Sequence, residues 1–163
     1  MIFVTLGTQD KQFRRLLDAT LALRIDEKVV IQYGSTKPDE DMVENLEKNF
    51  ELHQYLSNEE FDKYMKEARV IITHAGVGTI IEGLKLDKMM IVVARLKKYK
   101  EHVNNHQLQI LDTFEKEGYI LRLDDFSKLP ELLKENFKPK KFNSNKNNFN
   151  TYLEEEIYKL IKK

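Results

Sequence analysis

The chain has 163 residues, which is the length of one ordinary domain with a single hydrophobic core. Its 27 Lys and Arg residues balance 27 Asp and Glu residues, which excludes charge-driven disorder and a broadly basic surface for nucleic acid. Because cysteine is absent, disulfides, thiolate metal sites and a cysteine nucleophile are excluded. No stretch reaches about 18 consecutive apolar residues and no secretory leader is recognisable, so we expect a soluble, cytoplasmic chain.

Short apolar runs rich in β-branched residues alternate with longer segments of helical spacing. This alternation is typical of a parallel sheet whose two faces are covered by helices. The predicted fold class is α/β, with a doubly wound, Rossmann-like sheet of six parallel strands. In chain order, the predicted strands span residues 2–6, 28–33, 51–53, 70–73, 90–93 and 119–123. Three helical faces are predicted from apolar residues at helical spacing: Phe13, Leu16, Leu17 and Leu21; Phe61, Tyr64 and Met65; Leu108, Leu111 and Phe114.

Two features mark the ends of these helices. Ser57 and Asn58 precede an acidic pair, Glu59 and Glu60, which predicts the start of the second helix. Gly118 stands where the third helix should end before the last strand.

The composition changes near residue 138. We predict one domain over residues 1–137, a polar, Asn-rich linker over 138–149 and a C-terminal helix over 150–163. The apolar residues of that helix are Tyr152, Leu153, Ile157, Leu160 and Ile161. This face either packs on the chain's own sheet or docks on another protein.

Glycines follow three of the predicted strands, where the backbone must turn sharply or approach another group. In an open sheet of strand order 3-2-1-4-5-6, strands one and four are neighbours whose connections leave in opposite directions, which opens a crevice beyond their carboxyl ends. Two loops meet there. The first is Gly7, Thr8 and Gln9, and the second spans residues 74–79.

The second loop leads into a predicted helix over residues 80–86, whose first amides lack intrahelical partners. An anion such as a phosphate is favoured at that end. Gly76 and Gly78 leave the backbone open to it, Thr79 offers a hydroxyl, and the Glu82 carboxylate can accept from both hydroxyls of a ribose. The alternative is a tight turn with Thr79 as the helix cap and Glu82 solvated.

Two common nucleotide motifs are missing. The dinucleotide fingerprint needs three spaced glycines after the first strand and an acidic residue at the end of the second, which here ends in Gln32, Tyr33 and Gly34. No Gly-Lys-Ser/Thr sequence of a P-loop occurs. An oxidoreductase is therefore disfavoured.

Gly83 lies one turn into the predicted helix over residues 80–86. It is expected to let that helix lie close to the sheet.

A second polar cluster opens the helix after the fifth strand: His102, Asn104, Asn105, His106 and Gln107. Many directional donors and acceptors suit a polyhydroxylated ligand. His102 and His106 are four residues apart, but the glutamate of a His-Glu-x-x-His motif is missing, so we predict no metal site. The alternative is a polar loop in which Asn104 or Asn105 caps the helix.

Three segments together resemble a known family. They are Val-Thr-Leu-Gly-Thr-Gln at 4–9, Thr-His-Ala-Gly-Val-Gly-Thr-Ile-Ile-Glu-Gly at 73–83 and Asn-Asn-His-Gln at 104–107. This set resembles the nucleotide-sugar-binding half of GT-B glycosyltransferases. It is most similar to the glycosyltransferase family 28 C-terminal domain, particularly the short Alg13-like subunits and their bacterial counterparts in capsular and exopolysaccharide synthesis. The resemblance covers roughly residues 1–125.

The resemblance implies a UDP-sugar donor and a role for each segment. His106 stands where some relatives carry Asp or Glu before the Gln, which leaves the sugar open. No catalytic base is implied, and His102 is only a candidate. The implied donor contacts are His74, Gly76, Val77, Gly78 and Thr79 at the diphosphate, Gly7, Thr8 and Gln9 near the phosphates, Glu82 at the ribose, Asn105, His106 and Gln107 at the sugar, and Tyr55 and Leu56 near the uracil.

The same resemblance implies that the chain is the donor-binding catalytic subunit of an inverting glycosyltransferase. It would move a sugar to a polyprenyl-diphosphate-linked saccharide without a cofactor or an obligatory metal. The acceptor half would be a membrane-attached, Alg14-like partner that holds the chain at the inner face of the membrane, with the 150–163 helix as a contact. The alternative is a non-catalytic nucleotide-sugar-binding or scaffolding subunit.

Overall fold

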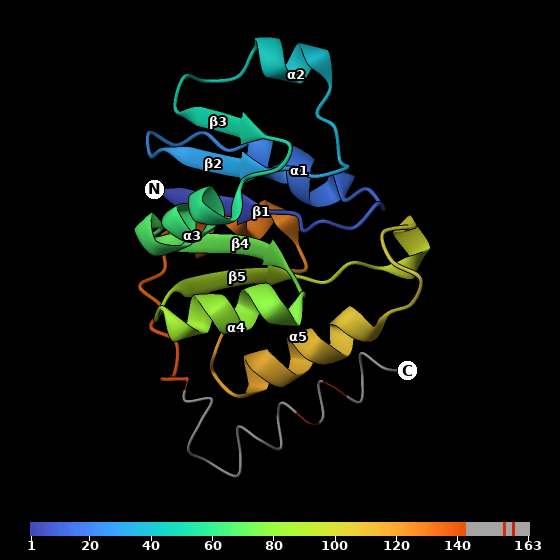
Figure 1. Cartoon of the computed structure of the whole chain (residues 1–163), viewed down its shortest axis with the longest axis vertical. Helices are drawn as coiled ribbons and strands as arrows, with labels where there is room; N and C mark the ends of the chain where they lie inside the picture. The colour runs from blue at the N-terminus through green and yellow to red at the C-terminus, as the bar shows by residue number, and fades with distance from the viewer. Residues whose placement is uncertain (143–154, 156–157, 159–163) are drawn as a thin grey trace.

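The computed structural model describes residues 1–142, 155 and 158. It contains one six-stranded sheet in which every neighbouring pair is parallel. The strand order is β3-β2-β1-β4-β5-β6, which confirms the predicted fold class and order (Figure 1). The strands are β1 (Ile2–Thr5), β2 (Val29–Gln32), β3 (Phe50–His53), β4 (Val70–His74), β5 (Met89–Val93) and β6 (Leu121–Arg122).

Six α-helices and two 3₁₀ turns connect or follow these strands in the described residues. They are α1 (Arg14–Leu21), α2 (Glu40–Glu44), α3 (Asn58–Glu67), α4 (Val77–Lys85), η1 (Lys97–Tyr99), α5 (His106–Lys116), η2 (Phe126–Lys128) and α6 (Leu129–Leu132). The sequence analysis did not predict α2, α6 or the 3₁₀ turns. These elements have three to five residues, which is too short to show an apolar helical stripe.

Two predicted elements have an end that differs from the structure by two residues or more. The helix expected over 80–86 begins at Val77 and ends at Lys85. The strand expected over 119–123 is reduced to Leu121–Arg122. In the second case the backbone N–H of Tyr119 donates to the Phe114 carbonyl oxygen at 3.1 Å, which closes the end of α5 and removes that amide from the sheet.

Each face of the sheet packs against its own set of helices. The strand residues Phe3, Ile71 and Met90 lie in one apolar cluster with residues of α3, α4 and α5. Their neighbours Ile2, Ile72 and Ile91 lie in the other cluster with residues of α1 and α6. Figure 1 shows α3 and α4 on one side of the sheet and α1 on the other. Burial on both faces explains why the strands read as continuous apolar runs.

The predicted signals at helix ends are confirmed. Ser57 caps α3: its hydroxyl accepts from the Glu60 N–H, and the Glu60 carboxylate accepts from the Ser57 N–H. Gly118 follows α5 with a φ of +76°. At Gly83 the helix α4 lies so close to β5 that an added Cβ would be 3.0 Å from Cε of Met90. A larger residue there would require the end of the Met90 side chain to move.

The first residues of the predicted linker pack against the domain. The Lys140 N–H donates to the Gly118 carbonyl oxygen at 3.0 Å. Phe142 is buried and its ring stands edge-on to Tyr119, with 5.6 Å between the ring centroids. The remainder of the linker, 143–149, and the predicted helix over 150–163 lie outside the described residues apart from 155 and 158.

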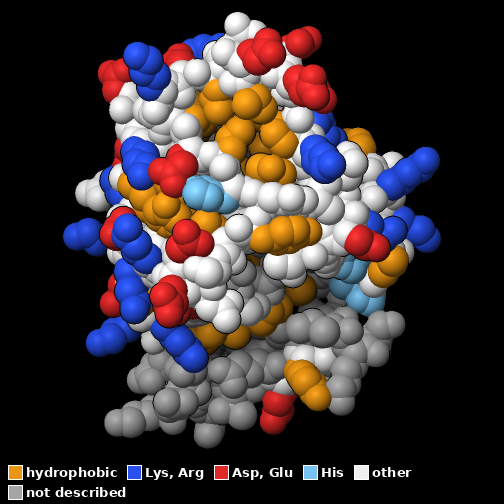
Figure 2. Space-filling view, turned by 45° about the horizontal axis from the view of Figure 1, so that its top comes forward, with side chains coloured by type: hydrophobic (Ala, Val, Ile, Leu, Met, Phe, Trp, Pro, Cys, Tyr) orange, Lys and Arg blue, Asp and Glu red, His pale blue; other side chains and the backbone are white. Residues whose placement is uncertain are grey.

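Charge on the surface is mixed in sign. On the face shown in Figure 2, Lys and Arg side chains are interspersed with Asp and Glu. Within the described residues, no helix has the length and apolar character that crossing a membrane requires.

Candidate functional site

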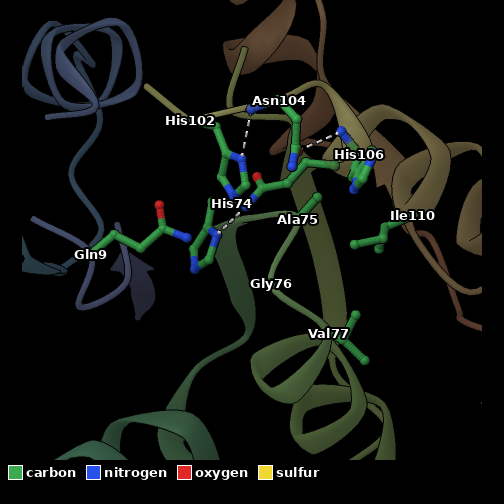
Figure 3. A pocket seen from close by; sticks show the side chains of 10 residues that line it. Gln9, His74, Ala75, Gly76, Val77, His102, Asn104, His106 and Ile110 are labelled. Carbon is green, nitrogen blue, oxygen red and sulfur yellow. Dashed lines mark hydrogen bonds between the residues drawn. The ribbon is translucent and has the colours of Figure 1, made fainter. Parts of the chain in front are cut away.

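A cavity of about 260 Å³ lies beyond the carboxyl ends of β1, β4 and β5. This is the place where the strand order predicts a ligand crevice. Figure 3 shows its lining side chains converging from the loops after these strands and from the first turns of α4 and α5. The lining residues are Gln9, His74, Ala75, Gly76, Val77, His102, Asn104, His106, Gln107 and Ile110.

The His74 imidazole lies between two glycines from different loops. A Cβ added at Gly7 would be 2.5 Å from His74 Nε2, and one added at Gly76 would be 2.8 Å from the same atom. Gly7 also has a φ of +80°, which L-residues with a side chain rarely adopt. The two glycines are therefore needed so that the loops after β1 and β4 can close around one aromatic ring.

His74 is an uncharged group at neutral pH. Its side chain is buried, and this loss of water, followed by the positive charge of Arg95, lowers its pKa to about 3. The ring can therefore offer a ligand hydrogen bonds but no charge.

The start of α4 supplies backbone donors. Gly76 is the residue before the helix, and Val77, Gly78 and Thr79 form its first turn. The amides of this turn have no intrahelical carbonyl to bind, and they carry the positive end of the helix dipole. Thr79 is inside the helix, so the alternative in which it caps the helix is wrong. A Cβ added at Gly78 would meet no described atom within 4 Å, so the surface there is open.

Two asparagines order the loop before α5. Asn104 Oδ1 accepts from the His106 N–H at 3.0 Å, so Asn104 caps the first amide of the helix. Asn105 precedes the helix, but its Oδ1 accepts from the Lys97 N–H at 2.9 Å and binds the loop to η1. The alternative prediction, a polar loop in which an asparagine caps the helix, is therefore correct for Asn104. The same loop also lines the cavity.

His102 has one ring nitrogen engaged in the same loop. Its Nδ1 accepts from the Asn104 N–H at 3.3 Å. Burial, followed by the charge of Arg95, lowers its pKa. A neutral ring that accepts at Nδ1 carries its proton at Nε2, so this geometry gives His102 no free lone pair with which to act as a base.

Gln107 is buried in the first turn of α5, beside the carboxyl ends of β4 and β5. Its Oε1 accepts from the backbone N–H of Arg95 at 2.9 Å, and its Nε2 lies 3.2 Å from Nδ1 of His74. His106, beside it, is partly buried and lines the cavity.

Some residues that the resemblance assigned to the donor lie outside the cavity lining: Gly7, Thr8, Gly78, Thr79, Glu82, Asn105, Tyr55 and Leu56. Glu82 is on α4, and burial, followed by the charge of Asp62 on α3, raises its pKa. Tyr55 is 54% exposed after β3. The Leu56 N–H already donates to Gln32 Oε1 at 2.9 Å.

The sequence analysis missed three residues of this region. Ala75 and Ile110 add apolar surface to the cavity. Arg95 is 1% exposed and lies behind the site. A charged residue directly after the apolar run of β5 was the signal that could have identified Arg95.

Within residues 1–142, 155 and 158, no group of three or more His, Asp or Glu side chains is placed to hold a metal ion.

Comparisons with known proteins identify the family of the chain. The family described as "Glycosyltransferase family 28 C-terminal domain" matches residues 1–163. The "UDP-N-acetylglucosamine transferase subunit ALG13" of Candida albicans is 37% identical over 87 residues, which is 51% of this chain and 28% of that protein. The protein of the same name from Homo sapiens is 32% identical over 72 residues, which is 44% of this chain and 6% of that protein. The matches therefore cover less than a third of the length of these relatives.

Solved structures show the same fold. The NMR solution structure of ALG13 has a TM-score of 0.61 at 22% identity and covers 96% of both chains. The crystal structure of the glycotransferase of kitacinnamycin has a TM-score of 0.64 at 19% identity, over 99% of this chain and 39% of that one. The chain therefore belongs to the glycosyltransferase family 28 C-terminal domain family and is an Alg13-like member with the fold of one half of a GT-B glycosyltransferase.

Proposed function

We propose that the chain is the donor-binding catalytic subunit of an inverting glycosyltransferase that uses a UDP-sugar. One observation carries this proposal: the His74 ring, held between Gly7 and Gly76, lies beside a cavity at the N-terminus of the nine-residue helix α4. Unpaired amides and the helix dipole favour a diphosphate at this end of a helix.

The sugar moiety would lie toward Asn104 and His106, whose polar atoms suit sugar hydroxyls. The curated relatives are named as subunits of a UDP-N-acetylglucosamine transferase, so UDP-N-acetylglucosamine is the first donor to test. The uracil would lie near Tyr55 and Leu56, after β3, and the ribose near Glu82.

In the proposed reaction, an acceptor hydroxyl forms a bond to the anomeric carbon on the face opposite UDP while the bond from that carbon to the UDP oxygen breaks. The amides of Val77, Gly78 and Thr79 and the α4 dipole would stabilise the charge on the departing diphosphate. His74 would add a hydrogen bond. No residue of this chain is assigned as the base that takes the hydroxyl proton, because His102 offers no free lone pair. We assign the base to the acceptor-binding chain.

That second chain would be an Alg14-like, membrane-attached subunit carrying a polyprenyl-diphosphate-linked saccharide at the cytoplasmic face of the membrane, in capsular or exopolysaccharide synthesis. The word "subunit" in the names of the relatives supports a partner. The apolar pattern of residues 150–163 supplies a candidate contact.

Isothermal titration calorimetry with UDP tests donor binding, and a sugar-transfer assay with the co-expressed partner tests catalysis. We expect UDP to bind the isolated chain and transfer to occur only when the partner is present. Partner binding without UDP affinity would instead identify a scaffolding subunit.

A Glu82→Ala substitution is expected to weaken UDP binding by about 1.5–3 kcal/mol, because a charged acceptor for the ribose hydroxyls is lost. Calorimetry with UDP and with 2′,3′-dideoxy-UDP checks the assignment. The wild-type chain should bind the dideoxy compound more weakly than UDP, whereas the variant should bind both equally. If the substitution weakened the binding of UDP and of the dideoxy compound by the same factor, Glu82 would be excluded from the ribose site.

The same residue predicts a pH effect. Because burial and Asp62 raise the pKa of Glu82, its carboxylate becomes protonated at a higher pH than an ordinary glutamate. UDP affinity should therefore fall on acidification, beginning above the usual glutamate range. A Glu82→Gln variant cannot titrate at this position and should show a flatter pH dependence than the wild type.

A further inference from the structure

We propose that Gln107 is a positioning residue that holds His74 in the neutral tautomer protonated at Nε2, so that the ring donates a hydrogen bond into the donor site. The arrangement of these groups is independent of ligand, whereas its consequence for the diphosphate rests on the proposed function.

The orientation of the Gln107 amide is fixed by the backbone. An N–H group can only donate, so the atom of Gln107 that lies 2.9 Å from the Arg95 nitrogen must be the oxygen. The side-chain NH₂ group then faces His74. Exchanging the two amide atoms would set two donors against each other at Arg95, in a place where both residues are buried.

The amide orientation determines the tautomer of His74. The Gln107 NH₂ group can only donate, so Nδ1 of His74, 3.2 Å away, must accept. A neutral ring that accepts at Nδ1 carries its proton on Nε2. Protonation of both nitrogens is opposed by burial and by the charge of Arg95 after β5, and His102 in the following loop adds to this only when it is itself protonated.

The proton on Nε2 lies where the proposed diphosphate would be. Nε2 is the ring atom flanked by Gly7 and Gly76, at the meeting point of the loops after β1 and β4. Figure 3 shows the Gln9 side chain pointing toward the same ring across the cavity. Phosphate oxygens are acceptors, so an Nε2–H group binds them, whereas the other tautomer would turn a lone pair toward them.

This role differs from the one that the resemblance implies for Gln107. Both polar ends of its side chain bind groups of the protein, Arg95 on one side and His74 on the other. Gln107 therefore acts at the phosphate end of the site through His74. His106 and Asn104 line the cavity beside it and offer polar atoms to the sugar.

Long-range ¹H–¹⁵N NMR of the ligand-free protein tests the proposal, because it distinguishes the two neutral tautomers and the charged form of each histidine. The chain has only four histidines, and a His74→Gln variant assigns the signals of His74. We expect the Nε2–H tautomer at pH 8, retained at pH 5. A charged ring at pH 5, or the Nδ1–H tautomer at either pH, would overturn the proposal.

A Gln107→Glu substitution reverses the hydrogen bond. One carboxylate oxygen still accepts from the Arg95 N–H, but the other can only accept, so the proton of His74 should move to Nδ1. We expect this change at pH 8 together with a loss of UDP affinity of about 10-fold or more. A folded variant whose His74 keeps its proton on Nε2 would contradict the proposal.

The control is Gln109→Glu, which makes the same change of charge on an exposed residue of the same helix. It should leave the tautomer and the UDP affinity unchanged. The tautomer is measured without ligand, so its result stands even if the wild-type chain fails to bind UDP. Such a failure would count against the proposed function alone.

Discussion

A Gly7→Ala variant is expected to bind UDP at least about 30-fold more weakly than the wild-type chain, as expected for the loss of a strong hydrogen bond at the phosphates. The new Cβ would lie 2.5 Å from His74 Nε2 and 3.0 Å from its Cδ2, so the ring must move away. Little space is left on the other side, because even a Cβ built at Gly76 would lie 2.8 Å from the same nitrogen. His74 can therefore no longer present its proton between the two loops.

The substitution also strains the backbone, because Gly7 has a φ of +80°. A Gly118→Ala variant is the matched control, since Gly118 has a φ of +76° and an added Cβ there would meet no described atom within 4 Å. Both variants should lose about 1–2 kcal/mol of unfolding free energy from the positive φ. Only Gly7→Ala should lose UDP affinity. Equal UDP binding by the two variants, measured by calorimetry, would show that Gly7 does not position His74.

An Arg95→Met substitution is expected to lower the free energy of unfolding by about 3 kcal/mol, because buried acceptors lose their partner. The Arg95 guanidinium donates to three backbone carbonyls: Lys11 at 2.9 Å, Glu101 at 3.2 Å and Leu6. It also lies over the Phe13 ring, 4.8 Å from the centroid. Methionine fills much of the volume but leaves the carbonyls without a donor.

Urea unfolding of the wild type and the variant measures this effect. Arg24→Met, on a side chain that is 75% exposed, is the control and should change the unfolding free energy by less than about 0.5 kcal/mol. Burial lowers the pKa of Arg95 to about 10, so the residue remains charged at neutral pH. If Arg95→Met were as stable as the control, the guanidinium would not be holding the loops after β1 and β5 together.

The sheet was predictable because its strands are buried on both faces. Short, continuous apolar runs such as Ile2–Thr5 and Met89–Val93 predict strands that are buried on both faces, because the chain also contains amphipathic helices that can cover a sheet. The start of α4 was not predictable in the same way. Its first turn contains Gly78, a poor helix former, so local propensity placed the start at Ile80. The loop after β4 and the packing of the helix on the sheet determine the true start.

The candidate site was predictable where the backbone determines it. The two glycine-containing loops meet because parallel strands end on the same edge of the sheet. The side-chain connections were not predictable, since the partners are distant in sequence. His74 and Gln107 are 33 residues apart, and Arg95 and Leu6 are 89 residues apart. The sequence pattern predicts that Gln107 lies at the start of a helix, but only the folded structure shows which groups its side-chain amide binds.

A crystal structure of the chain with UDP at saturating concentration tests the central claim most directly. We expect a phosphate oxygen within hydrogen-bond distance of His74 Nε2 and others at the amides of Val77, Gly78 or Thr79. A nucleotide bound elsewhere on the sheet, or a diphosphate whose oxygens contact neither that imidazole nor the first turn of α4, would contradict the account.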